Sequence, residues 1–210
     1  MKGPEHLAID PGDQESGWVR FRLAPKKPGG IEILAAGITE NRTLRLAMKD
    51  MPKPLRGTLS IEMPKAQGMA VANEVFATCV EIGRFLQTWG GLNWSYIFRG
   101  HVKLAICGAP NAKDPNVRMA LIDEFGGEKE AIGGKKCPKC KGKCWIGRDH
   151  DPCEACEDSP GWQYPPGPLK EFHDDMWAAL AVAITWAKEQ PKTHFLSASN
   201  KTSKRKKLRT

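Results

Sequence analysis

The chain has 210 residues, of which 40% are hydrophobic, and this is enough for one main domain with a buried core and a small appendage. No run approaches the roughly 18 consecutive apolar residues that a membrane-spanning helix requires, and the first residues lack the apolar stretch of a secretion signal. These observations exclude a membrane partner and predict a soluble protein of the cytoplasm. The formal net charge of +8 favours an acidic partner such as nucleic acid.

Most of this positive charge lies at the C-terminal end. Residues 201–210 hold six basic side chains and no acidic one, which leaves a net charge of only +2 on the rest of the chain. The whole segment 191–210 lacks hydrophobic periodicity, and we expect it to be a flexible basic tail. Such a tail can bind phosphates without sequence preference, but a solvated basic end that only aids solubility is an equally good interpretation.

The hydrophobic pattern predicts strands that alternate with helices along most of the chain. Short apolar or alternating runs predict five strands, at residues 6–10, 17–23, 31–37, 58–64 and 101–107. Helical periodicity and helix start and stop signals predict four helices, within residues 40–51, 68–89, 112–126 and 173–189. The segment 127–170 interrupts this order. We therefore expect an α/β fold with a mixed five-stranded sheet flanked by helices.

Three carboxylates stand where this fold would bring them together. Asp10 and Glu62 each end a predicted strand, and Asp175 lies in the first turn of the last helix. An acid after a single strand is most often a solvated turn residue, but acids at the ends of neighbouring strands can converge with one from a helix packed across them. Mg²⁺ prefers carboxylate oxygens, and phosphodiester hydrolysis commonly uses two such ions about 3.5–4 Å apart. The pattern predicts a metal-dependent nuclease centre.

Several ordered motifs resemble one family. The matching stretches are AIDPGDQESGWV (8–19), IEMPKAQGMAVANEVFATCVEIGRF (61–85), VKLAICGAPNAKDPNVRMALIDEFG (102–126), and PGPL with HDDMWAALAVAITWA (166–187). They resemble the RuvC-like Holliday junction resolvases, most closely the phage-borne branch. The resemblance implies an RNase H-like fold and a crossover junction endodeoxyribonuclease that cleaves branched DNA with Mg²⁺ or Mn²⁺. It also implies a homodimer and a phage-encoded protein that acts in a bacterial host.

The resemblance supports the acids of the strands more fully than those of the last helix. Asp10 and Glu62 match the first and second acids of the family. RuvC carries two acids three residues apart in its last helix; here Asp175 fills the first position and Ala178 the second. Asp174 is the nearest substitute by charge, although around a regular helix it points about 100° away from Asp175, and it can instead serve only as a helix cap. His173 is a third candidate, as a metal ligand or by orienting water.

Basic residues near the scissile strand are a further feature that the resemblance implies. Lys113 lies where the family places such residues, and Arg118 follows it in the next helix. Both are expected to contact DNA phosphates, although most surface lysines have no such role.

The segment 134–162 has the cysteine spacing of a zinc site. Cys137-Pro-Lys-Cys140 and Cys153-Glu-Ala-Cys156 are two CxxC pairs separated by twelve residues, which suits one tetrahedral Zn²⁺ with four thiolates. Free or redox-active thiols are the alternative. The run CPKCKGKCW also resembles the zinc elements of DnaJ-type proteins, which leaves Cys144 outside the ligand set, although it could exchange with Cys140. We expect a zinc-ribbon-like insert before the last helix, within a nuclease domain of residues 1–133 and 163–190.

This insert is basic at its first cysteine pair. We expect its lysines to form a DNA-facing flap, although a stabilising peg or a dimer contact is almost as good an interpretation; they are Lys135, Lys136, Lys139 and Lys141.

Two other functions fit parts of the sequence. An actin-like ATPase also begins with a strand that ends in Asp followed by a glycine-containing turn, but it requires a second related domain for which this chain is short. A non-catalytic DNA-binding protein with a degenerate nuclease centre is the other alternative, and Ala178 keeps it open.

Overall fold

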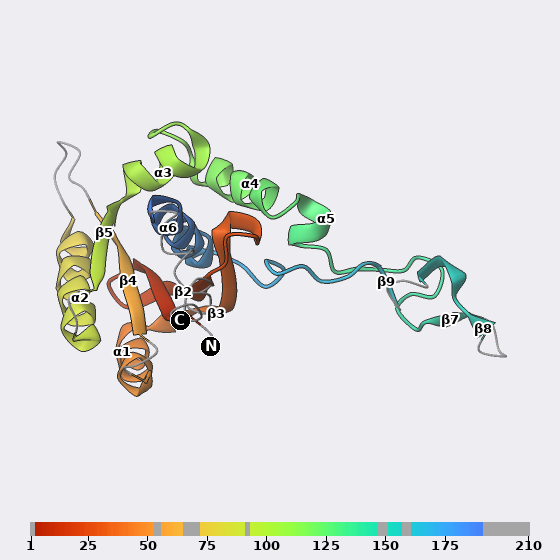
Figure 1. The fold of residues 1–210 in the computed structure, drawn as a ribbon, viewed down its shortest axis with the longest axis horizontal. Coiled ribbons are helices and arrows are strands. Elements are labelled where there is room, and N and C mark those ends of the chain that lie inside the picture. The colour runs from red at the N-terminus through yellow and green to blue at the C-terminus, as the bar shows by residue number, and fades with distance from the viewer. Residues whose placement is uncertain are drawn as a thin grey trace, which may run out of the picture.

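A five-stranded mixed sheet forms the centre of the computed structural model (Figure 1). The structure describes residues 3–52, 56–64, 72–90, 93–146, 151–156 and 161–190, without the side chains of residues 151, 152 and 156. The strand order is β3-β2-β1-β4-β5, in which β1, β2 and β3 are antiparallel neighbours while β4 and β5 run parallel to β1. The bounds are β1 (Glu5–Pro11), β2 (Glu15–Leu23), β3 (Ile31–Glu40), β4 (Arg56–Met63) and β5 (Trp94–Phe98). The expected α/β fold with a mixed five-stranded sheet is confirmed.

One predicted strand is wrong. Residues 101–107 belong to helix α3 (Arg99–Cys107), and the fifth strand is the preceding segment β5. A short apolar run cannot by itself distinguish a strand from a helix. Gly108, whose φ of 70° is left-handed, ends α3 by donating its N–H to the carbonyl of Leu104, and this glycine is the helix signal that the sequence contains.

Helices cover both faces of the sheet and divide the core in two. On one face, Leu7, Ile9, Leu59 and Ile61 pack against α1 (Asn41–Asp50) and α2 (Asn73–Trp89). On the other, Ala8, Val19 and Phe21 pack against the last helix, α6 (Asp175–Glu189), and against α4 (Asp114–Glu124). Because strand residues alternate between faces, β1 contributes to both cores, with Leu7 and Ile9 on one face and Ala8 on the other.

The cysteine-rich segment leaves the sheet domain after a short helix, α5 (Glu128–Ala131), and lies apart from it in Figure 1. It contains two small antiparallel pairs, β6 (Lys135–Lys136) with β9 (Trp162–Tyr164) and β7 (Trp145–Ile146) with β8 (Asp151–Pro152). Among the described residues there are also short 3-10 helices, η1 (Pro28–Gly30) before β3 and η3 (Glu154–Cys156) in the insert. The predicted tail, residues 191–210, lies outside the described residues.

A helix that crosses a membrane must be both long and apolar. Within the described ranges, no helix is both long enough and apolar enough to cross a lipid bilayer.

Candidate active site

Strand alternation places Asp10 and Glu62 on the same face of the sheet. In the parallel pair β1–β4, Ile9 lies opposite Ile61, and both point into the core beneath α1 and α2. The next residue on each strand therefore points to the opposite face, toward α6. Asp10 and Glu62, which follow Ile9 and Ile61 directly, therefore lie side by side on adjacent strands.

The third acid reaches them because α6 begins very close to β2. Gly17 lies opposite Asp10 in the β1–β2 pair, and a Cβ at Gly17 would stand 2.4 Å from the backbone oxygen of Asp175. Only a residue without a side chain permits this approach. The glycine therefore sets where Asp175 enters the site.

Two adjoining cavities surround these acids. The smaller, of about 290 Å³, is lined by Asp10, Glu62 and Asp175 together with residues of α3 and α4. The larger, of about 680 Å³, shares Asp10 and Glu62 and extends toward the start of α2 and the loop that follows α3. The carboxylates therefore stand between a small pocket and a wider adjoining cavity.

Burial and mutual repulsion perturb the acids. Burial, followed by the charge of Glu62, raises the pKa of Asp10 well above its usual value. Burial also raises the pKa of Glu62, although the Arg99 guanidinium opposes that shift. A bound cation would offset the repulsion between buried carboxylates of this kind. Acids with perturbed pKa values in a cleft are typical of functional sites.

Three charged residues of the site were not among the residues singled out from the sequence. Arg99, at the start of α3, contacts Glu62 at 2.9 Å (Nη1 to Oε1) and Asp114 at 3.0 Å (Nη2 to Oδ1). Lys103, one turn later, lies 3.2 Å from the same Oδ1 atom of Asp114. The misassigned strand hid this group, because Arg99 and Lys103 share one helical face only if residues 99–107 are a helix.

Asp174 and His173, the two further candidate ligands next to Asp175, lie in different surroundings. Asp174 lines the smaller cavity together with Asp175 and Ala178. It precedes the helix at a φ of 39°, and its side chain makes no capping hydrogen bond, so the alternative in which Asp174 serves only as a cap is wrong. The backbone departs from helical geometry there, which removes the 100° separation of a regular turn. His173 is exposed, lines neither cavity and contacts Asp174 at 3.1 Å.

Lys113 and Arg118, which are predicted to contact DNA phosphates, do not line either cavity. Lys113 is an exposed residue immediately before α4. The Arg118 guanidinium lies over the ring of Trp177 at 5.0 Å, so it packs against α6. Both remain predicted phosphate contacts at the rim of the site.

The acids suit a hard divalent cation. Among the described residues, the carboxylates of Asp10 and Asp175 have no hydrogen-bonding or ion-pairing partner, although both line the smaller cavity with Glu62. Oxygen donors from three elements around one small pocket are the ligands that Mg²⁺ and Mn²⁺ prefer.

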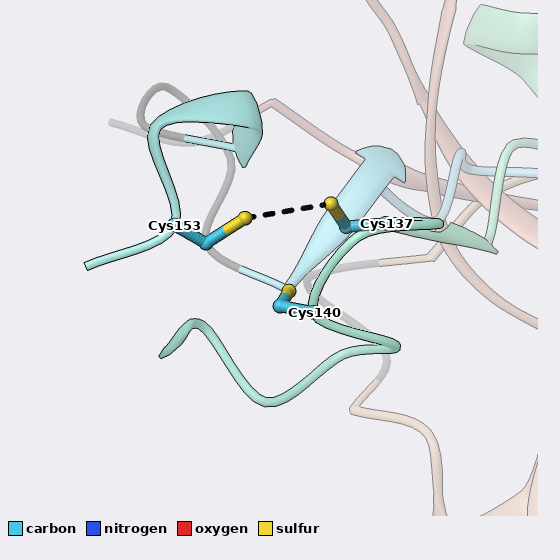
Figure 2. Close-up of side chains that lie close together, drawn as sticks. All are labelled: Cys137, Cys140 and Cys153. Atoms are coloured by element: carbon cyan, nitrogen blue, oxygen red, sulfur yellow. Dashed lines mark hydrogen bonds between the residues drawn. The ribbon is translucent and has the colours of Figure 1, made fainter. Parts of the chain in front are cut away.

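A second cluster lies in the insert and consists of sulfur atoms. The Sγ atoms of Cys137, Cys140 and Cys153 lie within 4.8 Å of one another, and all three residues are buried (Figure 2). Cys137 and Cys153 come from different pairs and approach to 3.8 Å. The side chain of Cys156, the fourth predicted ligand, lies outside the described residues. Converging thiols of this kind fit Zn²⁺.

Several other described residues of the insert are exposed. Cys144 is exposed and does not belong to the cluster. The four lysines predicted to face DNA, Lys135, Lys136, Lys139 and Lys141, are all exposed.

Solved structures with a similar fold are known, although the sequence itself matches no family. No protein-family model matches the sequence, and a search of curated proteins finds no match. Among solved structures, RuvC of Thermus thermophilus is similar with a TM-score of 0.52 at 13% identity, over 86% of this chain and 92% of that chain. RuvC of T. thermophilus in complex with a Holliday junction substrate is similar with a TM-score of 0.52 at 12% identity, over 87% and 92%. The chain therefore has the RNase H-like fold seen in RuvC.

Proposed function

We propose that this protein is a metal-dependent endonuclease that cleaves Holliday junctions or other branched DNA. The observation that carries the proposal is the convergence of Asp10, Glu62 and Asp175, from two adjacent strands and one helix, on a single pocket. The shared fold supports it, since one similar RuvC structure contains a Holliday junction substrate. The perturbed pKa values of Asp10 and Glu62 support it as well.

Each residue has a role in this proposal. Asp10, Glu62 and Asp175 would hold Mg²⁺ or Mn²⁺, with Asp174 as the candidate fourth ligand and His173 as its neighbour. The bound ions would polarise the scissile phosphodiester and lower the pKa of a water molecule. The larger cavity would receive the DNA strand, and Lys113 and Arg118 would contact its phosphates at the rim.

The insert would act as a separate zinc-stabilised module. We propose that residues 134–162 fold around one Zn²⁺ held by Cys137, Cys140, Cys153 and Cys156, because so short a segment has little apolar core of its own. Its exposed lysines would then present a basic surface to the branched DNA. The nuclease domain would comprise residues 1–133 and 163–190.

The proposal includes a homodimer of a phage-type resolvase. Exposed apolar side chains at one edge of the molecule offer a candidate interface. Phe76 is 61% exposed on α2, and Trp94 and Phe98 are 41% and 47% exposed on the edge strand β5. Aromatic residues are enriched in protein interfaces, and exposed apolar side chains often mark them.

The experiment that tests the proposal compares four-way, flap and linear duplex DNA as substrates with Mg²⁺. We expect the four-way and flap substrates to be cleaved and the linear duplex to be spared. Glu62→Gln, which keeps the side-chain shape but removes the charge, should abolish cleavage while the protein still binds the junction. Equal cleavage by Glu62→Gln and wild type would contradict the assignment.

Non-catalytic binding is a second candidate function, and one observation favours it. Ala178 lines the smaller cavity where the sequence resemblance implies an acid, so that wall lacks one carboxylate. A junction that is bound tightly but not cleaved with Mg²⁺ or Mn²⁺ would support this alternative.

A further inference from the structure

One arginine bridges the acidic pocket. The two terminal nitrogens of Arg99 contact different carboxylates, Glu62 of β4 at 2.9 Å and Asp114 of α4 at 3.0 Å. Glu62 has an exposed side-chain fraction of only 8%, whereas that of Arg99 is 42%. One end of the guanidinium is therefore held at a buried acid while the side chain stays accessible from outside.

Arg99 also stands where the two cavities meet. It lines the smaller cavity with Asp175 and Asp114, and the larger one with Pro64 and Asn111. Asp10 and Glu62 are the other residues common to both cavities. A strand entering the larger cavity would therefore meet Arg99 beside the acids.

The contact commits an oxygen of Glu62 that a metal ion would need. Burial alone would lower the pKa of Arg99, but Glu62, Asp10 and Asp114 raise it overall, so the guanidinium remains charged. A fixed positive charge at hydrogen-bonding distance from Glu62 competes with a divalent cation for the same carboxylate. A DNA phosphate offers the guanidinium an alternative partner with two oxygens in matching geometry.

We propose that Arg99 is a phosphate-binding residue that occupies the acidic pocket until DNA arrives, so that DNA binding and metal binding promote each other. In the free protein Arg99 neutralises Glu62 and Asp114. When a phosphodiester enters the larger cavity, Arg99 turns to it and releases Glu62 to the cation. This inference rests on the proposed nuclease function and deepens it. Such coupling is reciprocal, because a ligand that removes Arg99 from Glu62 favours the other ligand equally.

Lys103 provides the matched control. It carries the same charge and contacts Asp114 at 3.2 Å, but it forms no hydrogen bond or ion pair with Glu62 and acts on that carboxylate only through its charge. Loss of Lys103 removes a positive charge from the pocket and leaves the Arg99 to Glu62 contact in place. Comparison of the two variants thus separates the direct contact from general electrostatics.

The test measures Mn²⁺ affinity by titration calorimetry without DNA, for wild type, Arg99→Gln and Lys103→Gln. We expect Arg99→Gln to bind Mn²⁺ about tenfold more tightly than wild type, because a hydrogen-bonded charged competitor has been removed, and Lys103→Gln to change affinity less than about threefold. In EDTA, Arg99→Gln should bind a four-way junction about tenfold more weakly than wild type. Arg99→Lys, which keeps the charge but cannot reach both carboxylates equally well, covers the case in which Arg99→Gln fails to fold, and its Mn²⁺ affinity should be intermediate.

The outcomes separate this inference from the proposed function. If wild type binds Mn²⁺ and the Arg99 variants bind it no more tightly, the exchange of Arg99 is refuted while the metal site stands. An equal gain in Lys103→Gln, or unchanged junction affinity of Arg99→Gln in EDTA, also refutes it. If neither wild type nor any variant binds Mn²⁺, the metal centre fails and the inference fails with it.

Discussion

Gly17 gives the sharpest structural test of how the site is built. A Cβ at this position would stand 2.4 Å from the backbone oxygen, 2.6 Å from the carbonyl carbon and 2.8 Å from the Cβ of Asp175. Carbon atoms in good contact lie about 3.5–4.0 Å apart, so Gly17→Ala requires β2 and the start of α6 to separate by about 1 Å. The atoms that must move include backbone atoms of a proposed metal ligand, so a side-chain rotation cannot relieve the clash.

The expected cost has two parts. Overpacking of this kind costs about 1–3 kcal/mol, and a displacement of about 1 Å at a reacting centre can cost roughly a hundredfold in rate. We therefore expect Gly17→Ala to cleave a four-way junction about 100 times more slowly with Mg²⁺, with only a modest fall in melting temperature. The matched control is Gly83→Ala on α2, where an added Cβ would meet nothing within 4 Å. Wild-type cleavage by Gly17→Ala would refute the reasoning.

Three further predictions concern stability, the insert and assembly. Burial lowers the pKa of His6 from 6.5 to about 4, so its neutral form stabilises the fold fully above pH 6.5. Below pH 6.5 the unfolded chain binds a proton at His6 more readily than the folded protein does, so acid destabilises the fold. The free energy of unfolding, measured by urea denaturation, should therefore fall by about 3 kcal/mol more in wild type than in His6→Asn by pH 4. Parallel pH profiles of the two proteins would contradict this. Elemental analysis should find one zinc per chain, retained in Cys144→Ser and lost in Cys140→Ser, and zinc retained in both would exclude Cys140 as a ligand. Light scattering should show a dimer that Phe76→Asp disrupts and that a matched change on α1, Leu46→Asp, leaves intact; an unchanged dimer in Phe76→Asp would exclude that interface.

The convergence of the acids was predictable because strand ends and alternation are local properties. Asp10 and Glu62 end apolar strands that must pair in a sheet, and a two-residue period then assigns both to one face. The cysteine spacing was equally informative, because two CxxC turns have few ways to bring Cys137 and Cys153 together except around a metal. Patterns within a few residues therefore predicted both clusters.

The basic half of the site was not predictable in the same way. Helix α3 has a single buried hydrophobic residue, Val102, and Leu104 on it is 49% exposed, so its apolar residues do not mark one clear face. The strand β5 carries exposed aromatic residues, which weakens its own signal. The contact of Arg99 with Glu62 joins residues 37 positions apart, and only the tertiary arrangement shows it.

Asp114 illustrates a second reason why part of the site was not predictable from the sequence. An acid in the first turn of a helix is ordinarily explained by the helix dipole alone, so Asp114 carries no signal of its own in the sequence. In the structure its carboxylate accepts from both Arg99 and Lys103 at the rim of the pocket. A role of this kind depends on two helices that meet at one pocket, which no local pattern encodes.

The central claim is that Asp10 belongs to a metal-dependent nuclease centre. The most direct test is single-turnover cleavage of a four-way junction with Mg²⁺ by wild type and by Asp10→Asn, at protein concentrations that saturate the junction. Removing groups that only orient metal ligands costs roughly 10- to 100-fold, so loss of a ligand should slow cleavage by more than about 100-fold while junction binding persists. Cleavage by Asp10→Asn at the wild-type rate would contradict the claim.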